Sequence, residues 1–568
     1  MTSPTEMFSQ LARSVRGLLP GMTLPGAVVL WCLWCAVSAP GQAGGSPAET
    51  LAPAFIPLPT NTPPARLVPN NGIPTLEVDG APFLVLGAQC DVWRAVRRDA
   101  KTEAFFEGYQ AMNATTVSVG VPWANIELAK DCYDFQALDW FVGQAQRHGL
   151  KLVVDLFNSN VCGKLREGDA ANGWPVYTPA YIVDAPQEYQ RMVLPGPWRY
   201  NAGGPPMCPN DPRTLERERR LCVQVAAHLA KTDLRRTVIM LQIDNEFYYN
   251  QWEGARPPDE TEIRCHCRFC EEKWRQGVWK NGEDFMFHSF ADYLRELTGA
   301  ITAVYPLPLY INSPWWPPRV IPIFLDNCPN LALVGIDGVF APNEPNMFST
   351  SQVGRNLPFA AENPTENPKT RMNLDVLPYY SLIGQQGIGN LLWECGPPHT
   401  VVEDPQSRQR YGDALYPLRW AQEPIANARG TDNFLGWYLI RGSPTNSTMD
   451  VFGNFIAAAL ENRMAVREGT HSRMTAADHF VATLGELRFA VSESTAGIIV
   501  RQSPTEWVVA VPRGRIEIES PRPLQVAEGH YDRNQWQADG AFPVRKEGPK
   551  VVLEIREPKV LQLTLDKH

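Results

Sequence analysis

Carboxylate side chains closely follow two strongly apolar runs of this sequence. The run at 238–243 leads into Asn245 and Glu246, and the run at 357–361 leads into Glu362. Charged groups in such places are costly to desolvate unless they face a cleft. Hydrolysis of a glycosidic bond with retention requires two carboxyl groups, one to protonate the leaving oxygen and one to attack the anomeric carbon. Glu246 and Glu362 are candidates for this pair, and Asn245 is a candidate donor to a neighbouring sugar hydroxyl.

The two glutamates also have a structural interpretation. Either Glu246 or Glu362 could cap a helix or pair with an arginine at the rim of a domain. Glu366 and Glu394 are close in the sequence and compete with Glu362 for the second catalytic role. The choice of the second catalytic carboxylate therefore depends on where Glu362, Glu366 and Glu394 lie in the fold.

Short apolar runs alternate with longer amphipathic segments such as 135–147, which is typical of repeated βα units. Eight runs qualify as buried parallel strands: 83–90, 115–121, 150–157, 237–244, 308–313, 331–337, 357–361 and 389–393. Eight strands with interleaved helices predict an α/β fold, a (β/α)₈ TIM barrel over residues 74–474, with its active site at the carboxyl ends of the strands. Glu246 and Glu362 then end strands four and seven, on opposite sides of the barrel mouth.

Further residues at predicted strand ends could bind a sugar. Trp123 and Trp393 could stack an indole face on a pyranose ring, and Gln89, Asp337 and Glu394 could bind hydroxyl groups. The alternative for the tryptophans is ordinary packing in the core, and for the carboxylates a structural ion pair. We expect the substrate to be an oligosaccharide or another glycoside, because the chain is rich in aromatic residues that suit such ligands.

The segment 242–247 (Gln-Ile-Asp-Asn-Glu-Phe) resembles the acid/base strand of clan A glycoside hydrolases, particularly the β-galactosidases of families 42 and 35. The segments 87–89, 112–117 and 133–135, with Trp123, also resemble the start of those barrels. The resemblance covers roughly residues 74–400 and is most specific at the fourth strand. The segment 361–364 departs from family 35, in which aromatic residues flank the glutamate, and this leaves the exact family open.

This resemblance implies that Glu246 is the general acid/base and Glu362 the nucleophile. The implied function is a retaining exo-β-glycosidase, with β-galactosidase favoured, that releases terminal β-D-galactosyl residues by double displacement. β-Glucosidase, β-mannosidase and α-L-arabinopyranosidase remain alternatives, because a fold does not determine the sugar. A barrel that binds carbohydrate without catalysis is an alternative from another class of protein. The oligomeric state stays open.

Three cysteines in a C-x-C-x-x-C pattern, Cys265, Cys267 and Cys270, could occupy three corners of a tetrahedral zinc site. The resemblance to family 42 implies that Cys208 supplies the fourth ligand, and that the zinc ion is structural. His266 lies between two of the cysteines and is expected to point away. Disulfide bonds are the competing arrangement, because an exported protein meets oxidising conditions. No motif for an organic cofactor is present.

The first 43 residues are expected to be a signal peptide or another N-terminal leader. Arg13 and Arg16 precede a short apolar stretch at 27–37, and small residues near Ala43 suit a cleavage site. The stretch is too short and too interrupted for a stable membrane span. We therefore expect export to the periplasm or the medium and no membrane insertion after cleavage. An uncleaved anchor and a cytoplasmic location are the alternatives.

Residues 44–73 are rich in Pro and Ala and are expected to form a linker. Residues 475–568 show short alternating runs with turns between them and predict a C-terminal antiparallel β-sandwich domain. This domain could pack on the barrel alone or bind carbohydrate as well. The whole chain of 568 residues has a formal charge of −9, which argues against general nucleic-acid binding.

Overall fold

The computed structural model describes residues 62–90, 98–157, 177–194, 206–245, 264–314, 319–337, 354–364, 377–384, 386–394, 400–439, 473–474, 480–491, 495–532 and 535–566. The chain divides into two compact units, at residues 1–57 and 58–568, and every described residue belongs to the second unit. The predicted leader at 1–43 lies outside the described residues. None of the described helices is long and apolar enough to span a bilayer.

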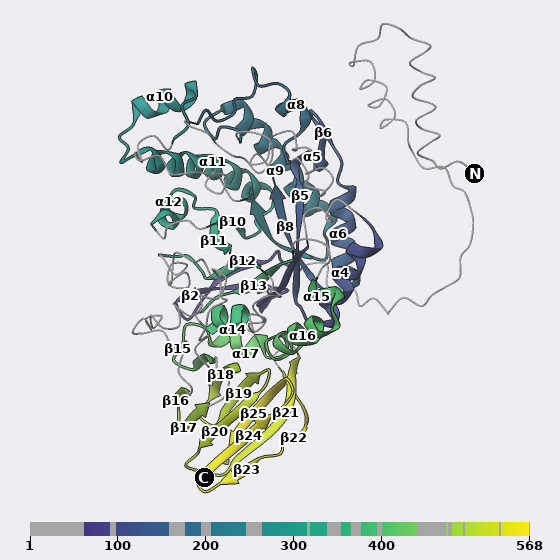
Figure 1. The fold of residues 1–568 in the computed structure, drawn as a ribbon, viewed down its shortest axis with the longest axis vertical. Helices are drawn as coiled ribbons and strands as arrows, with labels where there is room; N and C mark the ends of the chain where they lie inside the picture. Colours follow the sequence, from purple (N-terminus) through teal and green to yellow (C-terminus); the bar gives the residue numbers. More distant parts are fainter. Residues whose placement is uncertain are drawn as a thin grey trace, which may run out of the picture. The chain divides into compact units, whose positions relative to one another are not determined.

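Eight parallel strands form a closed barrel, as predicted (Figure 1). In chain order they are β4 (Val85–Cys90), β5 (Thr116–Pro122), β8 (Lys151–Phe157), β9 (Val238–Ile243), β10 (Leu309–Pro314), β11 (Leu331–Asp337), β12 (Phe359–Pro364) and β13 (Gly389–Glu394). Each of the eight overlaps one predicted run. The runs are continuously apolar because parallel barrel strands are covered on both faces.

Helices connect the strands, and the longest begin at polar caps. They are α4 (Ala100–Ala111), α5 (Trp123–Ile126), α6 (Gln136–Arg147), α8 (Ala180–Val183), α9 (Pro212–Thr232), α10 (Arg268–Gln276), α11 (Gly282–Val304), α12 (Val320–Asn327), α14 (Leu377–Gly384), α15 (Thr400–Glu403), α16 (Pro405–Trp420) and α17 (Gln422–Ala428). The Asp211 side chain accepts from the backbone N–H of Arg213 at the start of α9, and Pro212 follows it. A capping aspartate and a proline in the first turn are strong helix-start signals. Cys208 therefore lies just before the first turn of α9, at a position that the cap holds in place.

A small antiparallel sheet precedes the barrel, and it corrects the predicted extent of the linker. Its strands are β1 (Arg66–Asn70), β2 (Ile73–Val78) and β3 (Ala81–Pro82). Asn71 and Gly72 form the first turn with φ of 49° and 81°, and Asp79 and Gly80 form the second with φ of 54° and 80°. Asn-Gly and Asp-Gly pairs favour such tight hairpins. Residues 66–73 are thus part of a hairpin, although the surrounding Pro-rich composition suggested a linker.

The C-terminal region is a β-sandwich of two sheets, as predicted (Figure 1). Six strands pair antiparallel in one sheet: β14 (Phe434–Leu439), β18 (Thr495–Ser503), β19 (Glu506–Val511), β21 (Leu524–Asp532), β22 (Gln535–Ala541) and β25 (Lys559–Leu565), and the short β15 (Arg473–Met474) runs parallel to β14. The other sheet holds β16 (Phe480–Leu484), β17 (Leu487–Val491), β20 (Gly514–Glu519), β23 (Arg545–Glu547) and β24 (Lys550–Ile555). Strand β14 lies inside the stretch that we assigned to the barrel, so the sandwich recruits residues before 475.

The larger sheet of the sandwich packs against the barrel. Along β18 the side chain of Ile498 joins the hydrophobic core of the barrel, whereas that of Ile499 joins the separate core between the two sheets. Successive side chains of a strand point to opposite faces, so one sheet serves both cores. Trp420 of α16 also meets His530 of β21, with ring centroids 5.2 Å apart. The packing role predicted for this domain is thus present in the structure.

Candidate active site

The carboxyl ends of four barrel strands contribute side chains to one hydrogen-bond network. Gln89 lies near the end of β4, Asn245 follows β9, Asn312 lies in β10 and Glu362 lies in β12. The Nδ2 atom of Asn312 donates to Asn245 Oδ1 at 2.8 Å and to Glu362 Oε1 at 3.4 Å. Gln89 Nε2 donates to the same oxygen of Glu362 at 2.8 Å. The structure therefore brings three of the sequence-predicted residues together and adds Asn312, which the sequence analysis missed.

Glu362 is half-buried and is held by these two amide groups. Amide N–H groups that point at a carboxylate stabilise its negative charge and fix its orientation. A carboxylate that attacks an anomeric carbon must be ionised and fixed in this way. The environment of Glu362 thus suits a nucleophile better than a proton donor.

Asn245 is positioned by the end of β9. Asp244 adopts a φ of 61°, a conformation that asparagine and aspartate tolerate better than most residues, and its Oδ1 accepts from the backbone N–H of Asn245 at 2.8 Å. The Oδ1 atom of Asn245 also accepts from Gln242 Nε2 at 3.0 Å, in addition to Asn312. The orientation of the Asn245 amide is therefore determined by two donors. Glu246, the next residue, lies outside the described residues.

The backbones of three other candidates lie at the same end of the barrel. Asp337 of β11 is the register partner of Glu362, and Trp393 of β13 is the register partner of Gln89. Glu394 follows as the partner of Cys90. The side chains of Asp337, Trp393 and Glu394 are outside the described residues, so only their places in the strands are known.

Trp123 takes a different role from the one predicted. Its side chain, at the start of α5, is fully buried, and its Nε1 donates to Glu127 Oε2 at 2.7 Å. Glu127 in turn accepts from the buried guanidinium of Arg217 on α9. An indole with no exposed face has no surface to stack on a sugar, so in this structure Trp123 is part of the core.

Asp155 lies directly beneath the network and was not a sequence candidate. It is fully buried in β8 and accepts from the hydroxyl of Ser118, from Gln89 Nε2 at 3.0 Å and from Tyr310 OH at 2.9 Å. Burial raises the pKa of Asp155 to about 6, although all three hydrogen bonds oppose this shift. A carboxylate in the middle of the apolar stretch Lys151–Phe157 was the signal that could have found it.

The four predicted metal-ligating cysteines come together. The sulfur atoms of Cys208, Cys265, Cys267 and Cys270 all lie within 4.8 Å of one another, and all four side chains are buried. None of these four is in a disulfide bond. Four sulfur atoms at such distances suit the corners of one tetrahedral zinc site. The arrangement thus fits the group that the resemblance implied.

The surroundings of the cysteines fit a bound cation as well. Backbone N–H groups of Val193 and Asn210 donate to Cys265 at 3.3 Å and to Cys208 at 3.4 Å. Burial raises the pKa of the Cys208 thiol, whereas hydrogen bonds from the thiols of Cys208, Cys265 and Cys270 lower the pKa of Cys267. A divalent cation bound by the four sulfur atoms would stabilise their thiolate forms.

His266 is not part of the cysteine group. Its Nδ1 atom lies 2.9 Å from Oε1 of Glu271, and the same carboxylate pairs with Arg264 at 2.8 Å. The imidazole is about one-third exposed and turned toward this ion pair. Its contacts agree with the expectation that it points away.

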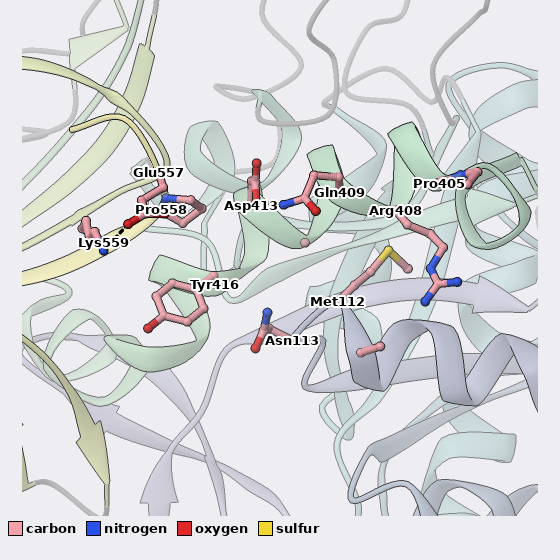
Figure 2. Close-up of a pocket in the computed structure, with 12 residues that line it drawn as sticks. Met112, Asn113, Pro405, Arg408, Gln409, Asp413, Tyr416, Glu557, Pro558 and Lys559 are labelled. Carbon is pink, nitrogen blue, oxygen red and sulfur yellow. Dashed lines mark hydrogen bonds and ion pairs between the residues drawn. The ribbon is translucent and has the colours of Figure 1, made fainter. Parts of the chain in front are cut away.

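Figure 2 shows a pocket, of about 490 Å³, whose lining includes Asn113 just before the amino end of β5, whereas the network lies at the carboxyl ends of the strands. Asn113, which precedes β5, lines it together with Tyr416 and Asp413 of α16 and Lys559 of β25. Polar side chains in this pocket already pair with neighbours, since Lys559 contacts Glu557 at 2.8 Å. Active sites of such barrels lie at the carboxyl ends of the strands, so this pocket is not the candidate active site.

Comparisons with known proteins agree with this fold. No protein family model matches the chain, and no curated protein matches it in sequence. A β-galactosidase from Bacillus circulans sp. alkalophilus is similar in structure, with a TM-score of 0.50 and 10% identity over 85% of this chain and 99% of that chain. A β-galactosidase from Rahnella sp. R3 has a TM-score of 0.48 and 10% identity over 85% of this chain and 98% of that chain.

A catalytic mutant of the GH42 β-galactosidase Gan42B from G. stearothermophilus also has a TM-score of 0.48 and 10% identity, over 85% of this chain and 98% of that chain. At 10% identity, the match to the Bacillus circulans enzyme, with its TM-score of 0.50, shows a shared fold. The resemblance to the barrels of clan A glycoside hydrolases is thereby confirmed at the level of the fold, and the activity has to be argued from the site.

Proposed function

We propose that this protein is a retaining exo-β-glycosidase, and specifically a β-galactosidase that releases terminal β-D-galactosyl residues. The observation that carries the proposal is the hydrogen-bond network that joins Glu362 of β12 to Asn245, the residue before Glu246. It links the ends of two barrel strands that carry the candidate carboxylates. Retaining hydrolysis needs two carboxyl groups on either side of the scissile bond.

The contacts support the roles of Glu362 and Asn245, and the resemblance supplies the role of Glu246. Glu362, oriented by the amides of Gln89 and Asn312, attacks the anomeric carbon. Glu246 protonates the leaving oxygen and later takes a proton from the water that releases the sugar. Asn245, held through its Oδ1, directs its donor end toward the hydroxyl beside the anomeric carbon. This contact strengthens as positive charge develops on the sugar ring.

The cysteine group has a structural role in this proposal. Cys208, Cys265, Cys267 and Cys270 would hold a zinc ion that joins the start of α9 to the start of α10. Four thiolates leave no open position for water or substrate, so the ion supplies folding energy and no catalytic step. We also propose that the leader directs export, which N-terminal sequencing of the mature protein would test by cleavage after Ala43.

The direct test is a panel of nitrophenyl glycosides offered to the wild type and to single variants. We expect hydrolysis of the β-galactoside, with a β-anomeric sugar released first in NMR spectra. Glu246→Ala and Glu362→Ala should each lower kcat by at least about a thousandfold, in the range for the loss of a catalytic group.

Azide rescue separates Glu362 from its competitors. Glycine replacement of the nucleophile leaves room for azide to attack the anomeric carbon, so azide should restore turnover in Glu362→Gly and form a glycosyl azide. Glu366→Gly and Glu394→Gly are the matched controls and should show no azide product. A folded wild type that binds galactosides but hydrolyses no glycoside would instead support a carbohydrate-binding barrel.

A further inference from the structure

Asp155 is a buried carboxylate that the proposed catalytic steps do not use. It lies in the interior of the barrel, and its contacts are with Gln89, Ser118 and Tyr310. None of these three partners carries a charge at neutral pH. A buried carboxylate with no cationic partner among the described residues is costly, so its presence beneath the candidate active site calls for a functional explanation.

Gln89 connects this carboxylate to Glu362. A single nitrogen, Nε2 of Gln89, donates to Asp155 Oδ2 at 3.0 Å and to Glu362 Oε1 at 2.8 Å. An amide NH₂ group has two hydrogen atoms, so both contacts can be made at once. The two carboxylates therefore share one amide group.

The charge of Asp155 determines which end of this amide faces Glu362. An ionised carboxylate can only accept hydrogen bonds, so Gln89 must present its NH₂ group to Asp155. The same NH₂ group then faces Glu362. If Asp155 gained a proton, it could donate to the carbonyl oxygen of a flipped Gln89 amide, and that oxygen would then repel Glu362.

We propose that Asp155 is a positioning residue that acts through Gln89 to hold Glu362 as an ionised nucleophile. This inference rests on the role of Glu362 in the proposed function. It assigns to Gln89 the orientation of the nucleophile, in place of the direct contact with sugar that the sequence suggested. The near-complete burial of Gln89, with 4% of its surface exposed, agrees with this role.

The proposal predicts a dependence on pH. Burial raises the pKa of Asp155 to about 6, so protonation of Asp155 would release the Gln89 amide in mildly acidic solution. The titratable groups that face this carboxylate among the described residues are Tyr310 from β10 and, beyond Gln89, Glu362 from β12. Because Asp155 and Glu362 share the Gln89 amide, the transition belongs to this pair of carboxylates.

A double-mutant cycle on the intact protein tests the proposal, with Asp155→Asn and Gln89→Ala as the two changes. The asparagine has the same shape but can donate to Gln89 and allow the flip. We expect Asp155→Asn to lower kcat by about tenfold to a hundredfold, the range for partners that orient a reacting group, with KM changed less than about threefold. In the Gln89→Ala background, Asp155→Asn should lower kcat by less than about threefold more.

A structural role for Asp155 would give a different result. In that case Asp155→Asn would lower kcat by the same factor in both backgrounds. The fall of kcat in mildly acidic solution, the acid limb of the pH profile, would also stay at the same pH. Either result would overturn the proposal. Asp233→Asn is the matched control, because Asp233 is another fully buried aspartate, bonded to backbone N–H groups of Thr237 and Val238 at the far end of β9. It should lose stability without moving the acid limb.

A second measurement does not depend on turnover. Infrared difference spectra between about pH 4 and 8, with Glu362→Gln as the blank, report the protonation of Glu362 itself. Loss of the Asp155 charge by itself makes Glu362 easier to ionise, whereas release of the Gln89 amide makes it harder, so the effect of Asp155→Asn is compared with and without Gln89. Asp155→Asn should shift the protonation of Glu362 to a higher pH when Gln89 is present than it does in the Gln89→Ala background. Equal shifts in the two backgrounds would overturn the inference. A wild type without glycosidase activity would overturn the proposed function alone.

Discussion

Asn245 and Glu362, at the ends of strands four and seven of the barrel, accept hydrogen bonds from one nitrogen atom, Nδ2 of Asn312. The two acceptor oxygens can therefore be no more than about 6 Å apart, the span of two hydrogen bonds. Strands that are far apart in the sequence thus present their polar ends to the same small volume. The side-chain amide of Asn312 links the ends of these two strands.

Loss of this bridge should impair turnover more than folding. Asn312→Ala removes the donor that Asn245 and Glu362 share, so both side chains gain freedom, and we expect kcat to fall by about tenfold to a hundredfold. Steady-state kinetics with the best nitrophenyl glycoside measure the effect. Asn327→Ala, which removes an amide that donates to the carbonyl of Ile323 within α12, is the control and should keep normal kinetics. Equal losses in the two variants would contradict the role of Asn312.

The cysteine group should bind close to one zinc ion per chain, measured by elemental analysis of the purified protein. Cys265→Ser should lose the metal and lower the melting temperature, because structural zinc contributes folding free energy. Cys132→Ser is the control, since Cys132 lies in the β6–β7 hairpin (Glu127–Ala129 and Cys132–Tyr133), outside the group. Retention of full metal content by Cys265→Ser would exclude the four-cysteine site.

Asp155 should make the protein less stable as the pH rises from about 4 to about 6. Its pKa is about 6 in the folded protein and 3.8 as the ordinary value, so the folded state binds the proton more tightly. The free energy of unfolding then decreases as the pH rises through this window, by about 3 kcal/mol in total. Urea unfolding at several pH values should show this decrease in the wild type. The slope should be smaller in Asp155→Asn, and identical slopes would contradict the assignment.

Gly87 should tolerate no side chain. A Cβ atom at this position of β4 would lie 1.7 Å from the carbonyl oxygen of Thr116 in β5. Gly87→Ala should therefore separate the two strands, displace Gln89 and lower both stability and kcat. Gly143→Ala is the matched control in the exposed face of α6, where a Cβ meets nothing within 4 Å. That change should stabilise the protein by about 0.5–1 kcal/mol in thermal or urea unfolding.

Local sequence patterns were sufficient to predict the two domains. Parallel barrel strands are buried on both faces, so each appears as an apolar run that can be recognised without its neighbours. The alternating runs of the C-terminal region likewise predicted the strands of a sandwich, such as the one that holds Ile498 and Ile499. The spacing of Cys265, Cys267 and Cys270 is local too, and it was enough to indicate a metal site.

Other features depended on contacts between distant segments. The hairpin at 66–73 was hidden by its Pro-rich surroundings, and β14 belongs to the sandwich only because it pairs with β18. Asn312 and Asp155 are single polar residues within apolar runs, and such residues are equally compatible with a satisfied core position. Trp123 was misjudged for the opposite reason. Its position at a strand end suggested an exposed indole, but the folded core buries it.

The apolar runs and the residues after them were therefore enough to predict eight strands in order and the residue types at their ends. Which of those side chains meet depends on barrel closure, which brings residues as distant as Gln89 and Glu362 to within one hydrogen bond. Hydrogen bonds require angstrom-scale placement, and no spacing along the chain encodes that placement across eight strands.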